Sequence, residues 1–221
     1  PLMIAPDKAR VILAAIGDRF DLHVESLTPV QLETMEQRAF GEIRTEDGVA
    51  IIPITGTLVN RAHGLNALSG LTSYAGLADL LLDAGTDPQV TGILLDIDSP
   101  GGEVSGLFDL VDTLQEVREM KPVFAVANDH ALSAAYAIAS ATDRLYVTRT
   151  GAVGSVGVIA VHVDESTANE QMGLTYTVVR AGAFKAEHNP YESLTEHAQT
   201  SLQGEVDRVY GMFTALIAGH R

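Results

Sequence analysis

A mainly apolar segment that ends in a glycine turn and leads into a helical pattern is the feature that most restricts the fold of this chain. Residues 93–97 read as a buried strand, Asp98-Ser99-Pro100-Gly101-Gly102 forms the turn, and residues 103–119 have helical periodicity. This succession is typical of α/β proteins. Further strands are predicted at 49–54, 123–127, 145–147, 156–161 and 175–179, and further helices at 7–16, 74–84, 133–141, 164–171 and 195–218. The chain is expected to be α/β, with repeated strand–strand–helix units around one core.

Length and composition set the number of domains and exclude several functions. With 221 residues, 46% of them hydrophobic, the chain is long enough for one sizeable core and a short appendage. Residues 1–47 are predicted to be a lead-in segment and residues 48–221 the main domain. A formal net charge of −15 disfavours nucleic acid and anionic membranes as partners, because both are polyanions.

Cysteine content and hydropathy add two more limits. The chain has no cysteine, which excludes disulfides, a thiol nucleophile and thiolate metal ligands, and is compatible with the cytosol. No apolar run approaches the roughly 20 residues that span a bilayer, so neither an anchor nor a signal peptide is predicted. Because the chain starts at Pro1 and stops at Arg221 directly after a helical pattern, we expect it to be part of a longer protein.

The glycine turn suits a site that binds negative charge. Gly101 and Gly102 allow backbone angles closed to other residues and let a ligand approach the amide groups closely. An ordinary strand-to-helix connection is the simpler alternative for such a turn. A nucleotide-binding loop is disfavoured, because neither a P-loop motif nor a dinucleotide-binding glycine motif is present.

Ser133 is the candidate nucleophile. It follows a predicted strand, begins a helix of small residues, and is followed by Ala134, whose amide is a candidate second oxyanion donor. Helix capping is the alternative explanation for a serine at this position. The Gly-x-Ser-x-Gly motif of the α/β-hydrolases is absent.

Lys185 is the candidate base, and Ser155 is a candidate partner for it. Lys185 lies in a mostly apolar stretch that contains Gly182, beyond a predicted strand, and would have to be neutral to accept the serine proton. Most lysines are instead solvated surface charges. Ser155 could hold the neutral amine in orientation, although a plain turn serine is the simpler interpretation of that residue.

Four motifs, in order and spacing, resemble the signal peptide peptidase A family of serine–lysine proteases. They are the turn at 98–102, the helix start at 133–136, the glycine-rich stretch 151–157 and the stretch 182–185. The resemblance implies a Clp-protease/crotonase-like fold and ring-like homo-oligomers. It also implies roles for individual residues: Ser133 as nucleophile, Lys185 as general base, Ser155 as the hydroxyl that coordinates the lysine, the Gly102 and Ala134 amides as oxyanion donors, and extended substrates beside Gly101 and Gly154.

Within that family the chain looks most like the bacteriophage capsid-assembly, or head-maturation, proteases. Residues 48–59, 92–98 and 189–191 carry this closer likeness. It implies that the substrates are the scaffold and other head proteins, cut in the host cytoplasm inside the immature head, with no cofactor and no metal. Two departures stand out: Ala134 and Ala135 replace glycines that often follow the nucleophile, and the chain stops before the closing strand region of such proteins.

Three alternatives remain open from the sequence. A Ser-His-Asp hydrolase could combine Ser133 with His162 and Asp164. A membrane-bound protease that degrades signal peptides is the second, and a non-catalytic scaffold or acyl-CoA-binding module on the same fold is the third. A metal enzyme is disfavoured, because the pairs Asp96/Asp98 and Glu187/His188 form no recognised ligand set.

Overall fold

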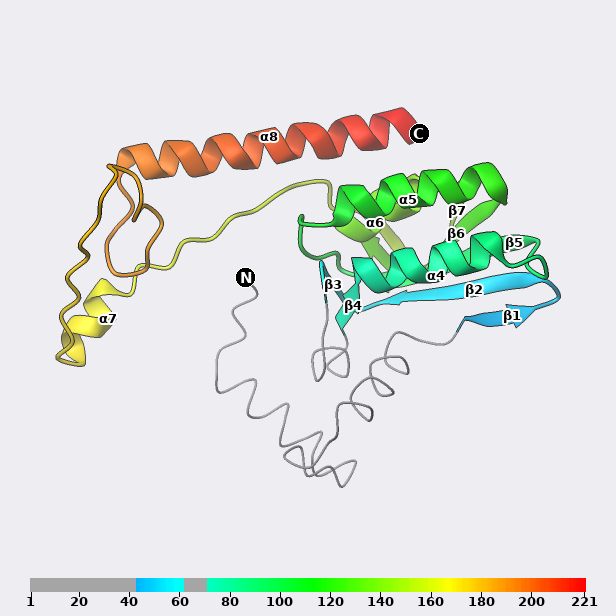
Figure 1. Cartoon of the computed structure of the whole chain (residues 1–221), viewed down its shortest axis with the longest axis horizontal. Helices are drawn as coiled ribbons and strands as arrows, with labels where there is room; N and C mark the ends of the chain where they lie inside the picture. The colour runs from blue at the N-terminus through cyan, green and yellow to red at the C-terminus, as the bar shows by residue number, and fades with distance from the viewer. Residues whose placement is uncertain (1–42, 62–70) are drawn as a thin grey trace, which may run out of the picture. The chain divides into compact units, whose positions relative to one another are not determined.

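A computed structural model describes residues 43–61 and 71–221 of the chain. Two compact units are distinguished (Figure 1): the first runs to Ser155 and includes His220–Arg221, and the second is Val156–Gly219. Each unit is described by itself. The helix predicted at 7–16 lies outside the described residues.

The first unit is built on a six-stranded, mainly parallel sheet. Its path is β1-β2-β5-β6-β7, and β8 pairs with the end of β6. Only β1 runs antiparallel to its neighbour. The strands are β1 (Arg44–Glu46), β2 (Val49–Thr55), β5 (Gly92–Ser99), β6 (Val123–Leu132), β7 (Arg144–Val147) and β8 (Ala152–Gly154), and a separate parallel pair is formed by β3 (Thr57–Val59) and β4 (Leu71–Ser73).

Three helices complete this unit: α4 (Tyr74–Thr86), α5 (Leu107–Met120) and α6 (Ala134–Ser140). Figure 1 shows α4 and α5 next to each other over one face of the sheet. The core consists of alternate strand residues packed against the apolar sides of the helices. Among its fully buried members are Ile52, Leu95, Leu114, Ala125 and Ile138. This arrangement confirms the predicted α/β class.

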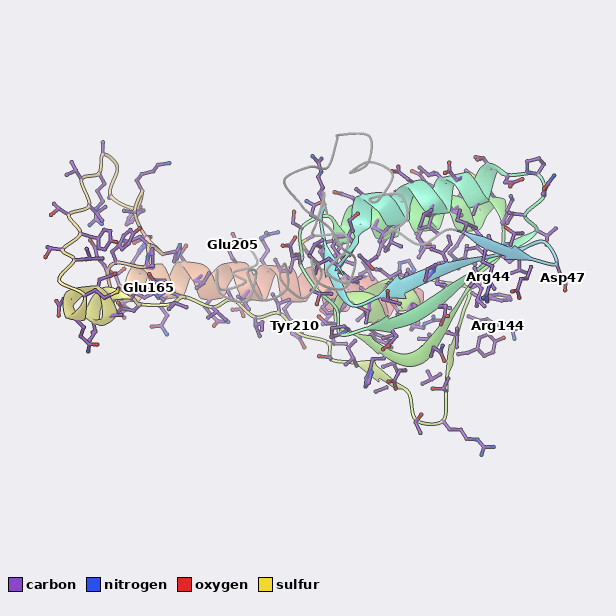
Figure 2. The ribbon with its side chains drawn as sticks, turned by 90° about the horizontal axis from the view of Figure 1, so that it is seen from below. Arg44, Asp47, Arg144, Glu165, Glu205 and Tyr210 are labelled. Atoms are coloured by element: carbon purple, nitrogen blue, oxygen red, sulfur yellow. The ribbon has the colours of Figure 1, made fainter. Side chains whose placement is uncertain are left out.

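The parallel sheet has two functionally different ends. Figure 2 shows Arg44, Asp47 and Arg144 at one of them, close to where β2 and β7 begin. The carboxyl ends of the strands and the turns that follow them lie at the other end. In open α/β sheets, sites are built at the carboxyl ends.

Most of the predicted elements are confirmed. The strands at 49–54, 93–97, 123–127 and 145–147 and the helices at 74–84, 133–141, 164–171 and 195–218 are present, with ends shifted by a few residues. Strand β6 continues past residue 127 to Leu132, because β8 supplies a partner that pairs His130 with Ala152 and Leu132 with Gly154.

The predicted helix start at Glu103 is wrong, and α5 begins at Leu107. The N–H of Glu103 donates to the carbonyl of Leu58 (2.9 Å), which holds this residue in an extended connection. Gly106 then takes a left-handed conformation with φ 86° as the N-cap of α5. Residues 103–106 therefore belong to the connection that follows the glycine turn, and α5 begins only after them.

The strands predicted at 156–161 and 175–179 are also wrong: in the described part of the chain neither segment has a paired neighbour. Their side chains remain open to solvent, with Ile159 89% and Val179 93% exposed. Both segments are rich in β-branched residues, but a strand also needs a partner for its backbone N–H and C=O groups. The second unit instead contains α7 (Ser166–Gln171) and all but the last residue of α8 (Glu196–His220).

Candidate active site

The glycine turn and Ser133 lie directly against each other, next to the ends of β5 and β6. Gly101 has φ 97°, and a Cβ atom added to it would lie 2.7 Å from the Cβ of Ser133 and 2.8 Å from the carbonyl oxygen of Leu132. Real Cβ atoms do not approach other atoms this closely, so no residue larger than glycine fits here. The two motifs are far apart in the sequence but lie in contact, because they follow the neighbouring parallel strands β5 and β6.

Gly102 is fixed by a parallel bridge to Leu58. The N–H of Leu58 donates to the carbonyl of Gly101 (2.9 Å), and the carbonyl of Leu58 accepts from the N–H of Glu103 (2.9 Å). Because successive N–H groups of an extended strand point to opposite sides, the N–H of Gly102 is directed away from Leu58. This backbone leaves the Gly102 amide available to a ligand.

Side chains outside the turn hold it in this shape. The hydroxyl of Ser99, which is fully buried, donates to the carbonyl of Gly56 (2.6 Å) and accepts from the N–H of Gly101 (3.1 Å). The phenol of Tyr74 donates to the carbonyl of Glu103 (2.7 Å). Burial, with the nearby Glu103 carboxylate, raises the pKa of Tyr74 and keeps it a donor. Sequence reasoning missed Tyr74, since no local signal links it to a turn so distant along the chain.

Ser133 occupies a strained backbone conformation between β6 and α6. Its φ is 53° and its ψ −120°, and its side chain makes no capping hydrogen bond. Helix capping, the simpler alternative for this serine, is therefore wrong: a capping serine has extended backbone angles and bonds the N–H groups of the first turn. A non-glycine residue in such a conformation costs of order 1–3 kcal/mol and is found mainly at functional positions.

The backbone nitrogens of Ser133 and Ala134 lie next to β8 and the glycine turn, respectively. Its own N–H donates to the carbonyl of Gly154 (2.8 Å), which fixes the serine to the end of β8. The backbone nitrogen of Ala134, the first residue of α6, would lie 3.0 Å from a Cβ added to Gly101. The Ala134 amide therefore lies against the glycine turn, where the sequence places a second oxyanion donor.

Gly154 and Ser155 continue the same site. Gly154 has φ 117° and open space where a side chain would be, and Ser155 has φ 54°, again unusual for a residue other than glycine. Six predicted residues of the first unit are thus neighbours in space or sequence: Gly101, Gly102, Ser133, Ala134, Gly154 and Ser155. Whether the Ser155 hydroxyl orients a lysine stays a prediction.

Lys185 belongs to the second unit. It is exposed within the loop at 182–189, and its N–H donates to the carbonyl of Gly182 (3.3 Å). Its assignment as the base stays a prediction.

The second unit gives no support to the His162/Asp164 pair of a Ser-His-Asp triad. The Nε2 atom of His162 bonds the carbonyl of Asn189 (2.8 Å). Asp164 accepts from the N–H of Ser166 (2.9 Å) and from the hydroxyl of Ser193. Hydrogen bonds from Ser166 and then Ser193 lower the pKa of Asp164 to about 2, with His162 only a minor cause. Both side chains are thus used to connect segments of the second unit.

Asp98, Asp129 and His130 form a group that the sequence did not single out. Their ligand atoms all lie within 4.8 Å of one another, and the three residues are exposed. The N–H of His130 donates to the Asp98 carboxylate (3.3 Å). Exposed acidic groups of this kind are common without a metal, so this geometry assigns no ion.

The fold and the site together define the class of protein. Residues 115–221 match peptidase family S49. The resemblance to signal peptide peptidase A proteins is confirmed by a match to the putative signal peptide peptidase SppA of Enterococcus faecium, 28% identical and covering 61% of this chain and 40% of that protein. The resemblance to phage capsid-assembly proteases is confirmed by the relatives that follow.

Two of these relatives come from phages. The chain is 38% identical over 232 residues to the head-tail preconnector protein GP5 of Enterobacteria phage P21, a match that covers 99% of this chain and 46% of that protein. It is 37% identical over 237 residues to capsid assembly protease C of Escherichia phage lambda, covering 100% of this chain and 54% of that protein. The chain therefore spans about half the length of these relatives.

Solved structures with a similar arrangement are more distant. One is a mutant of the 1510-N membrane-bound stomatin-specific protease in complex with a substrate peptide: 20% identity, TM-score 0.40, 52% of this chain and 46% of that one covered. Another is an enoyl-CoA hydratase from Mycobacterium avium subsp. paratuberculosis: 17% identity, TM-score 0.42, 80% and 82% covered. Within the described ranges, no helix has the length and apolar character needed to cross a membrane.

Proposed function

We propose that this chain is the protease portion of a phage capsid-assembly protease, a serine endopeptidase with a Ser-Lys dyad. The observation that carries the proposal is the contact between a strained Ser133 and the turn at Gly101: a Cβ atom on Gly101 would lie 2.7 Å from the Cβ of Ser133 and 3.0 Å from the backbone nitrogen of Ala134. The match of residues 115–221 to peptidase family S49 and the likeness to capsid assembly protease C of phage lambda support peptide hydrolysis as the reaction.

In the proposed mechanism the neutral amine of Lys185 takes the proton of the Ser133 hydroxyl. The Ser133 oxygen attacks the peptide carbonyl, and the amides of Gly102 and Ala134 donate to the oxyanion. The Lys185 ammonium returns the proton to the leaving amine, which leaves an acyl-enzyme. Water then attacks the ester, again with the amine as base, and releases the second product. Ser155 keeps the amine in orientation, and an extended substrate lies beside Gly101 and Gly154.

The proposed substrates are the scaffold and other proteins of the immature head. Support comes from the printed function of the phage lambda relative, a capsid assembly protease. Cleavage would take place in the host cytoplasm within that head, by a homo-oligomer that needs neither nucleic acid nor a membrane. The charge of −15 agrees with the exclusion of polyanionic partners.

The test is processing of a full-length, scaffold-bearing protein, followed by intact mass over time. Ser133→Ala and Lys185→Ala are both expected to abolish processing while the far-UV circular dichroism stays unchanged. Two matched controls, Ser201→Ala on the exposed side of α8 and Lys121→Ala at the end of α5, are expected to retain it.

The pH dependence distinguishes the dyad from other bases. The rate of processing is expected to rise with pH as the amine of Lys185 loses its proton. Processing that persists in Lys185→Ala would refute the dyad. A rate that rises through the histidine range and is lost in His162→Ala would favour the triad.

A further inference from the structure

We propose that His197, in the first turn of α8, is a positioning residue for Lys185. It would do so by holding the loop at 182–189, which carries the lysine, through contacts with Phe184 and Glu187; we call these two contacts the clamp. The proposal rests on the proposed function in one respect, since it takes Lys185 to be the base. The loop and its contacts belong to the second unit.

The backbone bonds next to Lys185 in the loop are long: the N–H of Lys185 to the carbonyl of Gly182 measures 3.3 Å, and the N–H of Glu187 to the carbonyl of Phe184 measures 3.2 Å. A shorter bond, from the side-chain amide of Asn189 to the carbonyl of Ala186 (2.6 Å), closes the far end of the loop. Gly182 has φ 97°, a conformation that glycine enters and leaves without cost. Such bonds alone would leave the amine free to occupy many positions, whereas general base catalysis needs it within hydrogen-bond reach of one hydroxyl.

His197 supplies the missing constraint from two directions. The ring of Phe184, immediately before Lys185, stacks on the His197 imidazole with centroids 4.2 Å apart and planes 8° apart. The carboxylate of Glu187, two residues after Lys185, accepts from the edge of the same imidazole at Nδ1, 2.9 Å away. The His197 side chain therefore contacts the loop both before Lys185, at Phe184, and after it, at Glu187.

The bond to Glu187 does not depend on the charge of the imidazole. A carboxylate can only accept, so Nδ1 carries the hydrogen whether the ring is neutral or protonated. The Glu187 side chain is 15% exposed and the His197 side chain 59% exposed.

A second contact ties the loop to the same helical turn. The Nε2 atom of His188 bonds the carbonyl of Ala198 (3.0 Å). The loop thus meets α8 at two successive residues, His197 and Ala198. A residue that acts through this clamp should change the rate of the chemical step more than substrate binding.

The experiment measures how fast Ser133 reacts with a phosphonofluoridate, together with kcat and KM on a peptide substrate, in the full-length protein. His197→Ala and Phe184→Ala are expected to slow labelling of Ser133 and to lower kcat by about tenfold or more, with KM changed less than about twofold. Phe184→Tyr keeps the stacking ring and is expected to restore the wild-type rate.

The control is another aromatic stack in the same unit. Tyr176 and Tyr191 stack with centroids 4.1 Å apart and planes 16° apart. Tyr191→Ala therefore removes a similar stack that includes no residue of the loop at 182–189, and is expected to leave the labelling rate unchanged. Labelling of His197→Ala at the wild-type rate, or an equal slowing in Tyr191→Ala, would overturn the proposal.

A double mutant separates this proposal from the assignment of the base. If Lys185 is the base and His197 acts through it, adding His197→Ala to Lys185→Ala should not slow labelling further. A further tenfold loss in the double mutant would refute positioning through Lys185. Wild-type labelling in Lys185→Ala alone would instead refute the proposed dyad.

Discussion

Replacement of Ser133 by glycine should stabilise the protein, although it removes the proposed nucleophile. Ser133 has φ 53° and ψ −120°, a conformation that costs a non-glycine residue about 1–3 kcal/mol. Glycine adopts it without that cost but loses about 0.5–1 kcal/mol more backbone entropy on folding. The difference leaves a net gain of about 1 kcal/mol for Ser133→Gly. Ser133→Ala keeps the strain and loses no capping bond, so it should lie within about 0.5 kcal/mol of the wild type.

Urea unfolding followed by far-UV circular dichroism measures this difference, since the chain has no tryptophan to report by fluorescence. The slope of the transition should be the same in all variants, so that its midpoint reports stability. In thermal unfolding, 1 kcal/mol corresponds to about 2–4 °C for a protein of this size. Ala137→Gly is the control: it makes the same kind of change at a fully buried position inside α6 and should lower stability by about 1–2 kcal/mol.

Two results would refute the reasoning. If Ser133→Gly is no more stable than Ser133→Ala, the backbone at Ser133 is not strained. If Ser133→Ala loses 1 kcal/mol or more, its hydroxyl makes a structural bond, as a helix cap would. Both variants lack the hydroxyl, so lost activity cannot confuse the comparison.

Three further predictions follow from other contacts. Gly101→Ala should abolish substrate processing and lower the melting temperature, because the new Cβ would lie 2.7 Å from the Cβ of Ser133. Arg118→Ala should cost about 1–3 kcal/mol in urea unfolding, and Arg118→Lys should not restore it, because the guanidinium bonds the Asp143 carboxylate through two nitrogens (2.8 and 3.1 Å). The pKa of Asp164 is lowered to about 2, so its charge contributes stability above about pH 4 that is lost as the pH falls toward 2; Asp164→Asn should flatten that part of an acid titration followed by circular dichroism.

The elements that the sequence predicts well are those whose partners are also strong strands. Residues 49–54, 93–97 and 123–127 are apolar runs that pair with one another in register, so local propensity and tertiary context agree. The segments 156–161 and 175–179 have equally strong propensity, yet they form no strand in the described part of the chain. A β-strand is defined by its neighbour, which a single segment of sequence does not encode.

The site shows the same division between local and long-range information. The motifs around Gly101 and Ser133 could be placed together because parallel strands end at a common edge. The side chains that stabilise the glycine turn, such as Tyr74, could not be predicted from the sequence. A hydrogen bond to a main-chain carbonyl far along the chain leaves no pattern in the sequence. His197 was missed for the same reason: its partners Phe184 and Glu187 are a loop away.

Non-glycine residues with positive φ indicate functional positions without reference to any sequence motif. Among the described residues, four other than glycine have positive φ: Asp47, Ser133, Ser155 and His188. Asp47 lies in the turn between β1 and β2, where such a conformation is ordinary. Ser133 and Ser155 are both predicted site residues, and His188 ends the stretch that carries Lys185. Strain of this kind persists only where the surroundings enforce it. Its occurrence at the two serines and in the loop that carries Lys185 supports the proposed site independently of residue type.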